Sequence, residues 1–175
     1  MPAHASLADR AYNRLLRTTP APRSTMDTET PDPLTRRVYV DMVGDLFHAG
    51  HVALLREARS HGDHLVVGVL GDETTAAYKR RPVMTLAERV AVIESCRYVD
   101  EVVADAPSVV DEGFLDEHAI TTVVHGDDLD LDGAASIYGP AVERGTLVLV
   151  ERTGDLSTTQ VIQRVLERSS EVNTG

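Results

Sequence analysis

From Val38 onward, short apolar segments alternate with longer segments that have helical periodicity. This alternation predicts an α/β fold with a doubly wound, Rossmann-like parallel sheet of about five strands and right-handed crossovers. In such a sheet, ligands bind outside the carboxyl ends of the strands, where the strand order reverses. We expect strands at Val38–Asp41, His64–Leu70, Val99–Ala104, Thr121–His125 and Thr146–Val150, and helices near His51–Ser60, Asp72–Ala77, Leu86–Arg97, Asp111–His118, Ala134–Arg144 and Ser157–Arg168.

Residues 1–35 have a different composition. Four prolines among serines and threonines between positions 20 and 33 are typical of a flexible linker. Before them, apolar residues from Leu7 to Leu16 recur at the spacing of a short amphipathic helix. We therefore predict a flexible N-terminal extension over residues 1–35 and a single domain over residues 36–170.

Composition excludes several classes of protein. The net charge of −11 argues against nucleic acid or an anionic membrane as the main partner. No apolar run approaches the length of a membrane span, and the N-terminus lacks the apolar centre of a signal peptide. The single cysteine, Cys96, is expected to be a buried core residue and fits a reducing compartment. We expect a cytoplasmic protein.

The segment His48-Ala49-Gly50-His51 follows the first predicted strand and opens the first predicted helix. Backbone N–H groups and the positive end of the helix dipole gather at such a junction, which suits phosphate. Gly50 allows a phosphate to approach the backbone closely. Imidazoles hydrogen-bond phosphate oxygens, and we expect the protonated rings to do so more strongly.

A second segment of this kind lies near the C-terminus. Glu151 to Thr159 follows an apolar strand and precedes a helical segment. Ser157 is a favourable N-cap, Thr158 and Thr159 add two hydroxyls, and Arg152 adds a planar cation. The chain has no P-loop, dinucleotide-binding glycine fingerprint or nucleophile elbow, which argues against those three chemistries.

Together these segments resemble the cytidylyltransferases of the HxGH nucleotidyltransferase superfamily, whose second signature is an Arg-Thr-x-Gly-Ile-Ser-Thr-Thr run. Here that run is Arg152 to Thr159, with Asp155-Leu156 where the family often has another residue and isoleucine. The resemblance covers roughly Val38 to Leu166. Many relatives have Gly-x-Phe-Asp before the first histidine, whereas this chain has Met42 at the glycine position. Three further segments resemble the ethanolamine-phosphate and choline-phosphate branch: Tyr78–Arg89, Cys96–Val103 and Val124–Asp128.

The resemblance implies transfer of CMP from CTP to a small phosphate monoester, with release of diphosphate. It implies that His48 and His51 stabilise the reacting α-phosphate, and that Lys79 and Arg152 neutralise phosphates. Mg²⁺ would be carried with CTP, largely by the nucleotide phosphates and water, with few protein ligands and no residue named as one. It also implies a homodimer, for which Arg97–Glu101 is the candidate shared face. The further nucleotide- and phosphate-binding residues implied are Val43, Gly44, Asp45, Gly50, Arg89, Gly126, Asp127, Ser157, Thr158 and Thr159.

The acceptor is open at this stage. Phosphoethanolamine and phosphocholine are the first candidates, and the absence of tryptophan disfavours a quaternary ammonium, which prefers an aromatic cage. Glycerol 3-phosphate and a small phosphonate such as hydroxyethylphosphonate are alternatives. An adenylyltransferase of the same superfamily and a nucleotide-binding module without catalysis are the competing functions.

Other polar segments have simpler interpretations. Asp128 to Gly133 resembles half of a calcium loop but lacks a glutamate at the twelfth position, so we expect a solvated acidic loop. His61 and His64 are expected at the end of the sheet away from the predicted site. For His125, lining the pocket and lying outside it are equally favoured. For Arg89, the alternative is a surface ion pair with Glu88 or Asp100.

Overall fold

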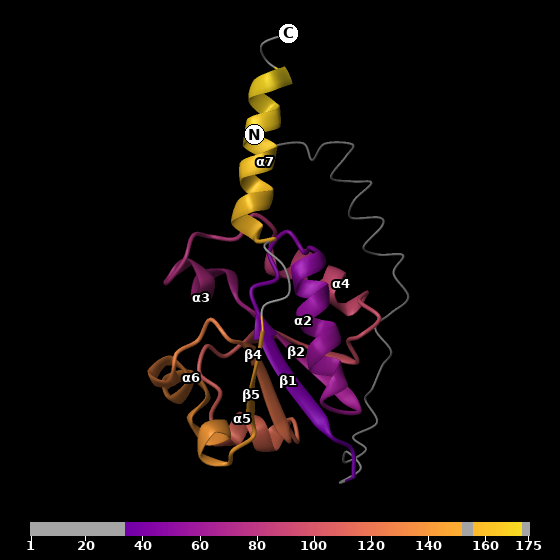
Figure 1. Ribbon diagram of the computed structural model, residues 1–175, viewed down its shortest axis with the longest axis vertical. Helices are drawn as coiled ribbons and strands as arrows, with labels where there is room; N and C mark the ends of the chain where they lie inside the picture. Colours follow the sequence, from indigo (N-terminus) through magenta and orange to yellow (C-terminus); the bar gives the residue numbers. More distant parts are fainter. Residues whose placement is uncertain (1–33, 152–155, 173–175) are drawn as a thin grey trace, which may run out of the picture. The chain divides into compact units, whose positions relative to one another are not determined.

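The structure is a computed structural model that describes residues 34–151 and 156–172. The chain divides into residues 1–32 and residues 33–175, and residues 1–33 of the predicted extension, with the predicted amphipathic helix, lie outside the described residues. The second unit contains a five-stranded sheet in which every neighbouring pair of strands is parallel (Figure 1). Its strands are β1 (Arg37–Met42), β2 (His64–Leu70), β3 (Glu101–Ala106), β4 (Thr122–Gly126) and β5 (Leu147–Val150).

The strand order is β3-β2-β1-β4-β5. The chain builds outward from β1 through β2 to β3, returns to the other side of β1, and continues through β4 to β5. The order therefore reverses between β1 and β4, and this is the position where a doubly wound sheet binds its ligand. The predicted fold class is confirmed.

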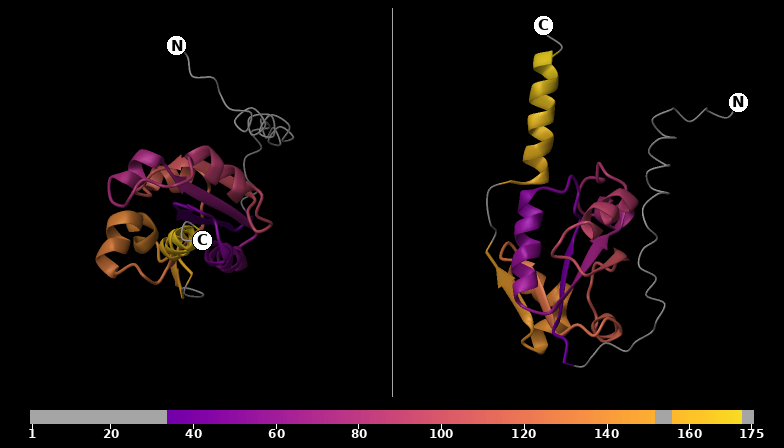
Figure 2. Two further views of the ribbon diagram at one scale, coloured as in Figure 1. Left: turned by 90° about the horizontal axis from the view of Figure 1, so that it is seen from above. Right: turned by 90° about the vertical axis from the view of Figure 1, so that its right-hand side faces the viewer.

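Helices cover both faces of the sheet (Figure 2). Alternate residues of β1 point to opposite faces: Val38 and Val40 pack in the cluster with α2 and α4, while Tyr39 packs in the cluster with α5 and α6. All three side chains are fully buried, as expected for a central strand covered on both sides. The helices are α2 (Ala49–Ser60), α3 (Asp72–Ala76), α4 (Leu86–Glu94), α5 (Glu112–Glu117), α6 (Leu131–Glu143) and α7 (Thr158–Val172).

Several element boundaries differ from the predictions by a few residues. Helix α4 ends at Glu94 rather than near Arg97, and β3 begins at Glu101 rather than Val99. Residues 95–100 form turns in between, and the Asp100 carboxylate accepts the backbone N–H of Leu65 at 2.8 Å. The Asp100 backbone N–H also donates to the Leu65 carbonyl oxygen at 3.0 Å, so Asp100 contacts β2 just before β3 begins. Cys96 is half-buried against the core and not fully buried as expected.

Helix α6 begins earlier than predicted because Asp130 acts as its N-cap, accepting the backbone N–H of Gly133 at 2.7 Å. An aspartate of the calcium-like run therefore has a structural role. The same helix is interrupted at Tyr138, two residues before Pro140. A proline inside a helix removes a backbone donor and bends the chain. The bend lies where the Tyr138 hydroxyl donates to Asp41 of β1 at 2.8 Å.

Candidate active site

A pocket of about 610 Å³ lies at the carboxyl ends of β1, β4 and β5, where the strand order reverses. Segments that are far apart in the sequence meet there, as the strand-end argument predicts. The predicted site residues that line it are Val43, Gly44, Asp45, His48, Gly50, His51, Lys79, Gly126, Ser157, Thr158 and Thr159; Asp41, Thr75, Arg80, His125 and Asp128 also line it.

His48 and His51 form a reciprocal capping arrangement at the start of α2. The His48 Nδ1 accepts the backbone N–H of Gly50 at 3.1 Å, and the His51 Nδ1 accepts the backbone N–H of His48 at 3.2 Å. Each imidazole thus satisfies a backbone donor that a helix start otherwise leaves unpaired. The sequence motif therefore serves the fold as well as the pocket.

The caps determine which ring nitrogen carries hydrogen. An Nδ1 that accepts a hydrogen bond has no proton, so the neutral ring carries its hydrogen on Nε2. Protonation would place a hydrogen on Nδ1 and break the cap. With each Nδ1 engaged in a cap, Nε2 is the ring nitrogen that can donate toward a phosphate, and the two ring centroids are 4.0 Å apart. The expectation that protonated imidazoles bind phosphate more strongly stays a prediction.

Gly50 and Gly44 both need to be glycine. A Cβ on Gly50 would lie 2.9 Å from the His48 Cε1 and 3.0 Å from the carbonyl oxygen of Leu156. Gly44 has a φ of +69°, and a Cβ there would lie 2.7 Å from the Ile93 Cδ1. Met42, at the position where many relatives have glycine, is the last residue of β1 and packs in the core. The loop after β1 thus turns at Gly44.

Asp45 connects three parts of the pocket wall. Its Oδ1 accepts the backbone N–H groups of Val83 and Met84, each at 3.0 Å, and its Oδ2 accepts Arg80 at 3.1 Å. Its backbone carbonyl accepts the Thr158 hydroxyl at 2.9 Å, which joins the two predicted helix starts. The carboxylate is thus engaged with the protein rather than directed at a phosphate.

The second helix start is built as predicted, within the described part of the chain. The Ser157 Oγ accepts the backbone N–H of Gln160 at 3.3 Å, and the Gln160 Oε1 accepts the backbone N–H of Ser157 at 2.8 Å. Arg152 lies outside the described residues. Among the described lysines and arginines, Lys79 and Arg80 line the pocket, and both lie on the loop between α3 and α4.

Arg89 does not line the pocket. Its side chain is fully buried, and it pairs with Asp72 at 2.5 Å rather than with Glu88 or Asp100. It also donates to the carbonyl oxygens of Val43, Leu70 and Met84. The sequence motif predicts that Arg89 binds phosphate. In the structure all of these partners are protein groups, so Arg89 has a structural role instead.

Asp41 is a pocket group that the sequence interpretation missed, and the buried Tyr138 donates to it from behind. Burial raises the pKa of the Asp41 carboxyl, although the Tyr138 hydroxyl and His125 act in the opposite direction. His125 lines the pocket, and its Nδ1 lies 2.9 Å from the carbonyl oxygen of Gly126, to which it donates. The position of Asp41 at a strand end was a usable signal.

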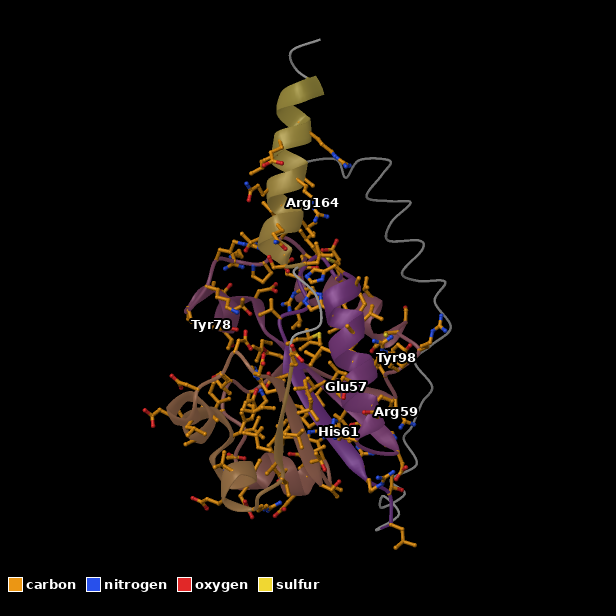
Figure 3. All side chains as sticks on the ribbon, viewed as in Figure 1. Glu57, Arg59, His61, Tyr78, Tyr98 and Arg164 are labelled. Atoms are coloured by element: carbon orange, nitrogen blue, oxygen red, sulfur yellow. The ribbon has the colours of Figure 1, made fainter. Side chains whose placement is uncertain are left out.

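The remaining candidates lie away from the pocket. Asp127 is exposed and does not line it; its backbone N–H pairs with the carbonyl oxygen of Val150. His61 lies at the far end of α2, near Glu57 and Arg59, as Figure 3 shows. His64 pairs with Glu101 at 3.3 Å. Among the described residues, no helix is long and apolar enough to cross a membrane.

Comparison with known proteins agrees with this geometry. A family model described as cytidylyltransferase-like matches residues 44–164. An ethanolamine-phosphate cytidylyltransferase from Dictyostelium discoideum is 40% identical over 143 residues, which cover 79% of this chain and 40% of the relative. A choline-phosphate cytidylyltransferase A from Homo sapiens is 40% identical over 141 residues, which cover 78% of this chain and 38% of the relative.

The chain thus spans about two fifths of the length of these relatives. Among solved structures, a lipopolysaccharide core biosynthesis protein from Thermoplasma volcanium aligns with a TM-score of 0.56 and 25% identity. That alignment covers 70% of this chain and 99% of the other. A family match over more than half of the chain, with relatives at 40% identity, leads to one conclusion: the chain belongs to the cytidylyltransferase-like family.

Proposed function

We propose that this protein transfers CMP from CTP to a small phosphate monoester that carries an ammonium group, as phosphoethanolamine does. The observation that carries the proposal is the meeting of two capped helix starts in one pocket, joined by the bond from Thr158 to the Asp45 carbonyl. Each helix start favours bound phosphate through its N–H groups and dipole. The names of the relatives support the nucleotide and the class of acceptor.

The transfer is a single displacement. A phosphate oxygen of the acceptor forms a bond to the α-phosphorus of CTP, the bond from that phosphorus to the bridging oxygen breaks, and diphosphate leaves with the electron pair. Positioning and charge stabilisation supply most of the rate in such reactions. We assign the Nε2–H donors of His48 and His51 to the α-phosphate oxygens. Lys79 and Arg152 would balance the phosphate charges.

Magnesium fits this site as a companion of the nucleotide. Asp41 accepts the Tyr138 hydroxyl, and Asp45 accepts Arg80 and two backbone N–H groups. Within the described ranges, no group of three or more histidine, cysteine, aspartate or glutamate side chains is arranged to hold a metal ion. Mg²⁺ bound to the triphosphate would offset part of its charge. We assign it no protein ligand.

Asp41 supports an acceptor with a positive charge. Its carboxylate lines the pocket, and among the described residues the neutral hydroxyl of Tyr138 is the side chain that donates hydrogen bonds to it. Burial disfavours the charged form of this carboxylate more than Tyr138 and His125 favour it, and an ammonium group on the acceptor would favour the charged form further. Glycerol 3-phosphate and hydroxyethylphosphonate lack such a group. The Asp41 environment therefore favours an amine-bearing phosphate.

The test is a diphosphate-release screen with CTP, UTP and ATP against phosphoethanolamine, phosphocholine, glycerol 3-phosphate and hydroxyethylphosphonate. We expect CTP with an amine-bearing phosphate to give the highest kcat/KM. When the wrong base leaves a buried polar group of the protein without a hydrogen bond, the site can discriminate against that nucleotide on the order of 10⁴-fold. Equal or better turnover with ATP would favour an adenylyltransferase. Preference for an acceptor that has no ammonium group would remove the role proposed for Asp41.

A further inference from the structure

The Met84 peptide is held at both ends by buried charged side chains. Asp45 accepts its N–H at 3.0 Å, and the Arg89 Nε donates to its carbonyl oxygen at 3.3 Å. Asp45 is 4% exposed, and Arg89 is fully buried. We refer to Asp45, Arg89 and the Met84 peptide as the clamp. Because both charges lie away from water, a substitution in either one leaves groups without partners.

The clamp is attached to the loop that precedes the histidines. Asp45 belongs to that loop, and Arg89 donates through Nη1 to the Val43 carbonyl oxygen on the same loop. The same Nη1 donates to the Leu70 carbonyl oxygen at 2.8 Å, and Nη2 pairs with Asp72. A satisfied polar network of this kind is rigid and specifies one arrangement. The Met84 peptide is thereby fixed relative to the histidine-bearing helix.

The clamp also anchors the loop between α3 and α4, which carries Lys79, Arg80 and Arg81. Lys79 is exposed at the pocket, and its backbone N–H pairs with the Thr75 carbonyl oxygen at 2.9 Å. Thr75 fixes one end of the loop to α3, and the clamp fixes the other end. Arg80 adds a third connection through its bond to Asp45. The position of Lys79 over the pocket therefore depends on bonds made several residues further along the chain.

We propose that Asp45 and Arg89 are positioning residues that hold the Lys79 loop in register with the two histidines. Neither contacts the reacting phosphates; they act through the backbone of residues 83 and 84. A displacement of about 1 Å in a reacting group can reduce the rate on the order of 10²-fold. The predicted effect on the rate rests on the proposed transfer reaction. The prediction that the clamp holds the Lys79 loop in place does not rest on that reaction.

The kinetic test is a double-mutant cycle between Asp45 and Lys79. We expect Asp45→Ala to lower kcat on the order of 10²-fold with a smaller change in KM for CTP. In the Lys79→Ala background, Asp45→Ala should cost less than about a further twofold, because the group that it positions is gone. Losses that multiply in the double variant would show that Asp45 acts independently of Lys79 and would overturn the proposal.

The second test needs no activity. Trypsin cleaves after Lys79 and Arg80, and the bond from Arg81 to Pro82 resists it. Without ligand, Asp45→Ala should be cut in this loop on the order of tenfold faster than the unmodified protein, because the loop is held by fewer bonds. Arg81→Gln is the matched control: it removes a charge from the same loop and an exposed pair with Glu73, and its cleavage rate should stay unchanged.

Should Asp45→Ala fail to fold, Asp45→Asn replaces it. The amide oxygen can still accept from Val83 and Met84, but the amide nitrogen then faces Arg80, so the loop loses only its third connection. Cleavage after Arg80 should then be intermediate between the unmodified protein and a fully released loop. An unchanged cleavage rate in a folded Asp45 variant would refute the clamp. Inactivity of the unmodified protein with every substrate would instead refute the proposed function.

Discussion

The double role of His48 can be separated by two substitutions. His48→Ala removes both the cap on the Gly50 N–H and the Nε2 donor at the pocket. Loss of an N-cap costs about 1 kcal/mol of unfolding free energy, which lowers Tm by roughly 3–5 °C in a domain of this size. Loss of a preorganised donor at developing charge costs about 2.7–4 kcal/mol of transition-state stabilisation, or 10²–10³-fold in kcat.

His48→Asn keeps one of these roles. Asparagine is among the best N-cap residues, so its side-chain oxygen can accept the same backbone donor. It is too short to present a donor where the histidine Nε2 lies. We expect Tm of His48→Asn to return to within about 1 °C of the unmodified protein, while kcat stays about 10²–10³-fold low.

The assay is diphosphate release with CTP under single-turnover conditions, with Tm followed by circular dichroism on the same preparations. Recovery of kcat together with Tm in His48→Asn would show that capping is the whole contribution of the histidine. A normal kcat in His48→Ala would remove the residue from the site altogether. Either result would refute the assignment of a phosphate-facing donor.

Three further outcomes are expected. Lys79→Ala should raise KM for CTP and lower kcat, and CTP with Mg²⁺ should slow tryptic cleavage at Lys79 in the unmodified protein; an unaltered digestion pattern would argue against closure of the loop on the nucleotide. Asp41→Asn should raise KM for an amine-bearing acceptor by about 10- to 100-fold and leave KM for CTP unchanged, whereas equal shifts in both constants would point to a general loss of structure. We propose a homodimer through Arg97–Glu101, and light scattering that gives the mass of a monomer at assay concentration would contradict it.

The local sequence determines much of this protein. The alternation of apolar strands and helices predicts the parallel sheet, because burial on both faces requires continuous apolar strands. The two helix starts are also local: His48 and Ser157 accept N–H groups only two or three residues away. Since parallel strands present their carboxyl ends at one edge, the sequence also predicts that both helix starts meet in one pocket.

Other features depend on contacts between distant segments. Arg89 could be a phosphate ligand or a surface residue by its sequence context, yet its partners come from positions 43, 70, 72 and 84. Asp45 likewise binds backbone groups 38 and 39 residues away. Tyr138 reaches Asp41 across 97 residues, at a bend that the helical pattern does not reveal.

The physical reason is that a charged side chain takes its role from the dielectric and the donors around it, and both are set by packing. Composition identifies Arg89 and Asp45 as charged groups, but only the folded chain decides whether they face a ligand or a buried carbonyl or N–H. The same holds for the histidines: the sequence places two imidazoles at a helix start, and the capping bonds decide which nitrogen is available to donate.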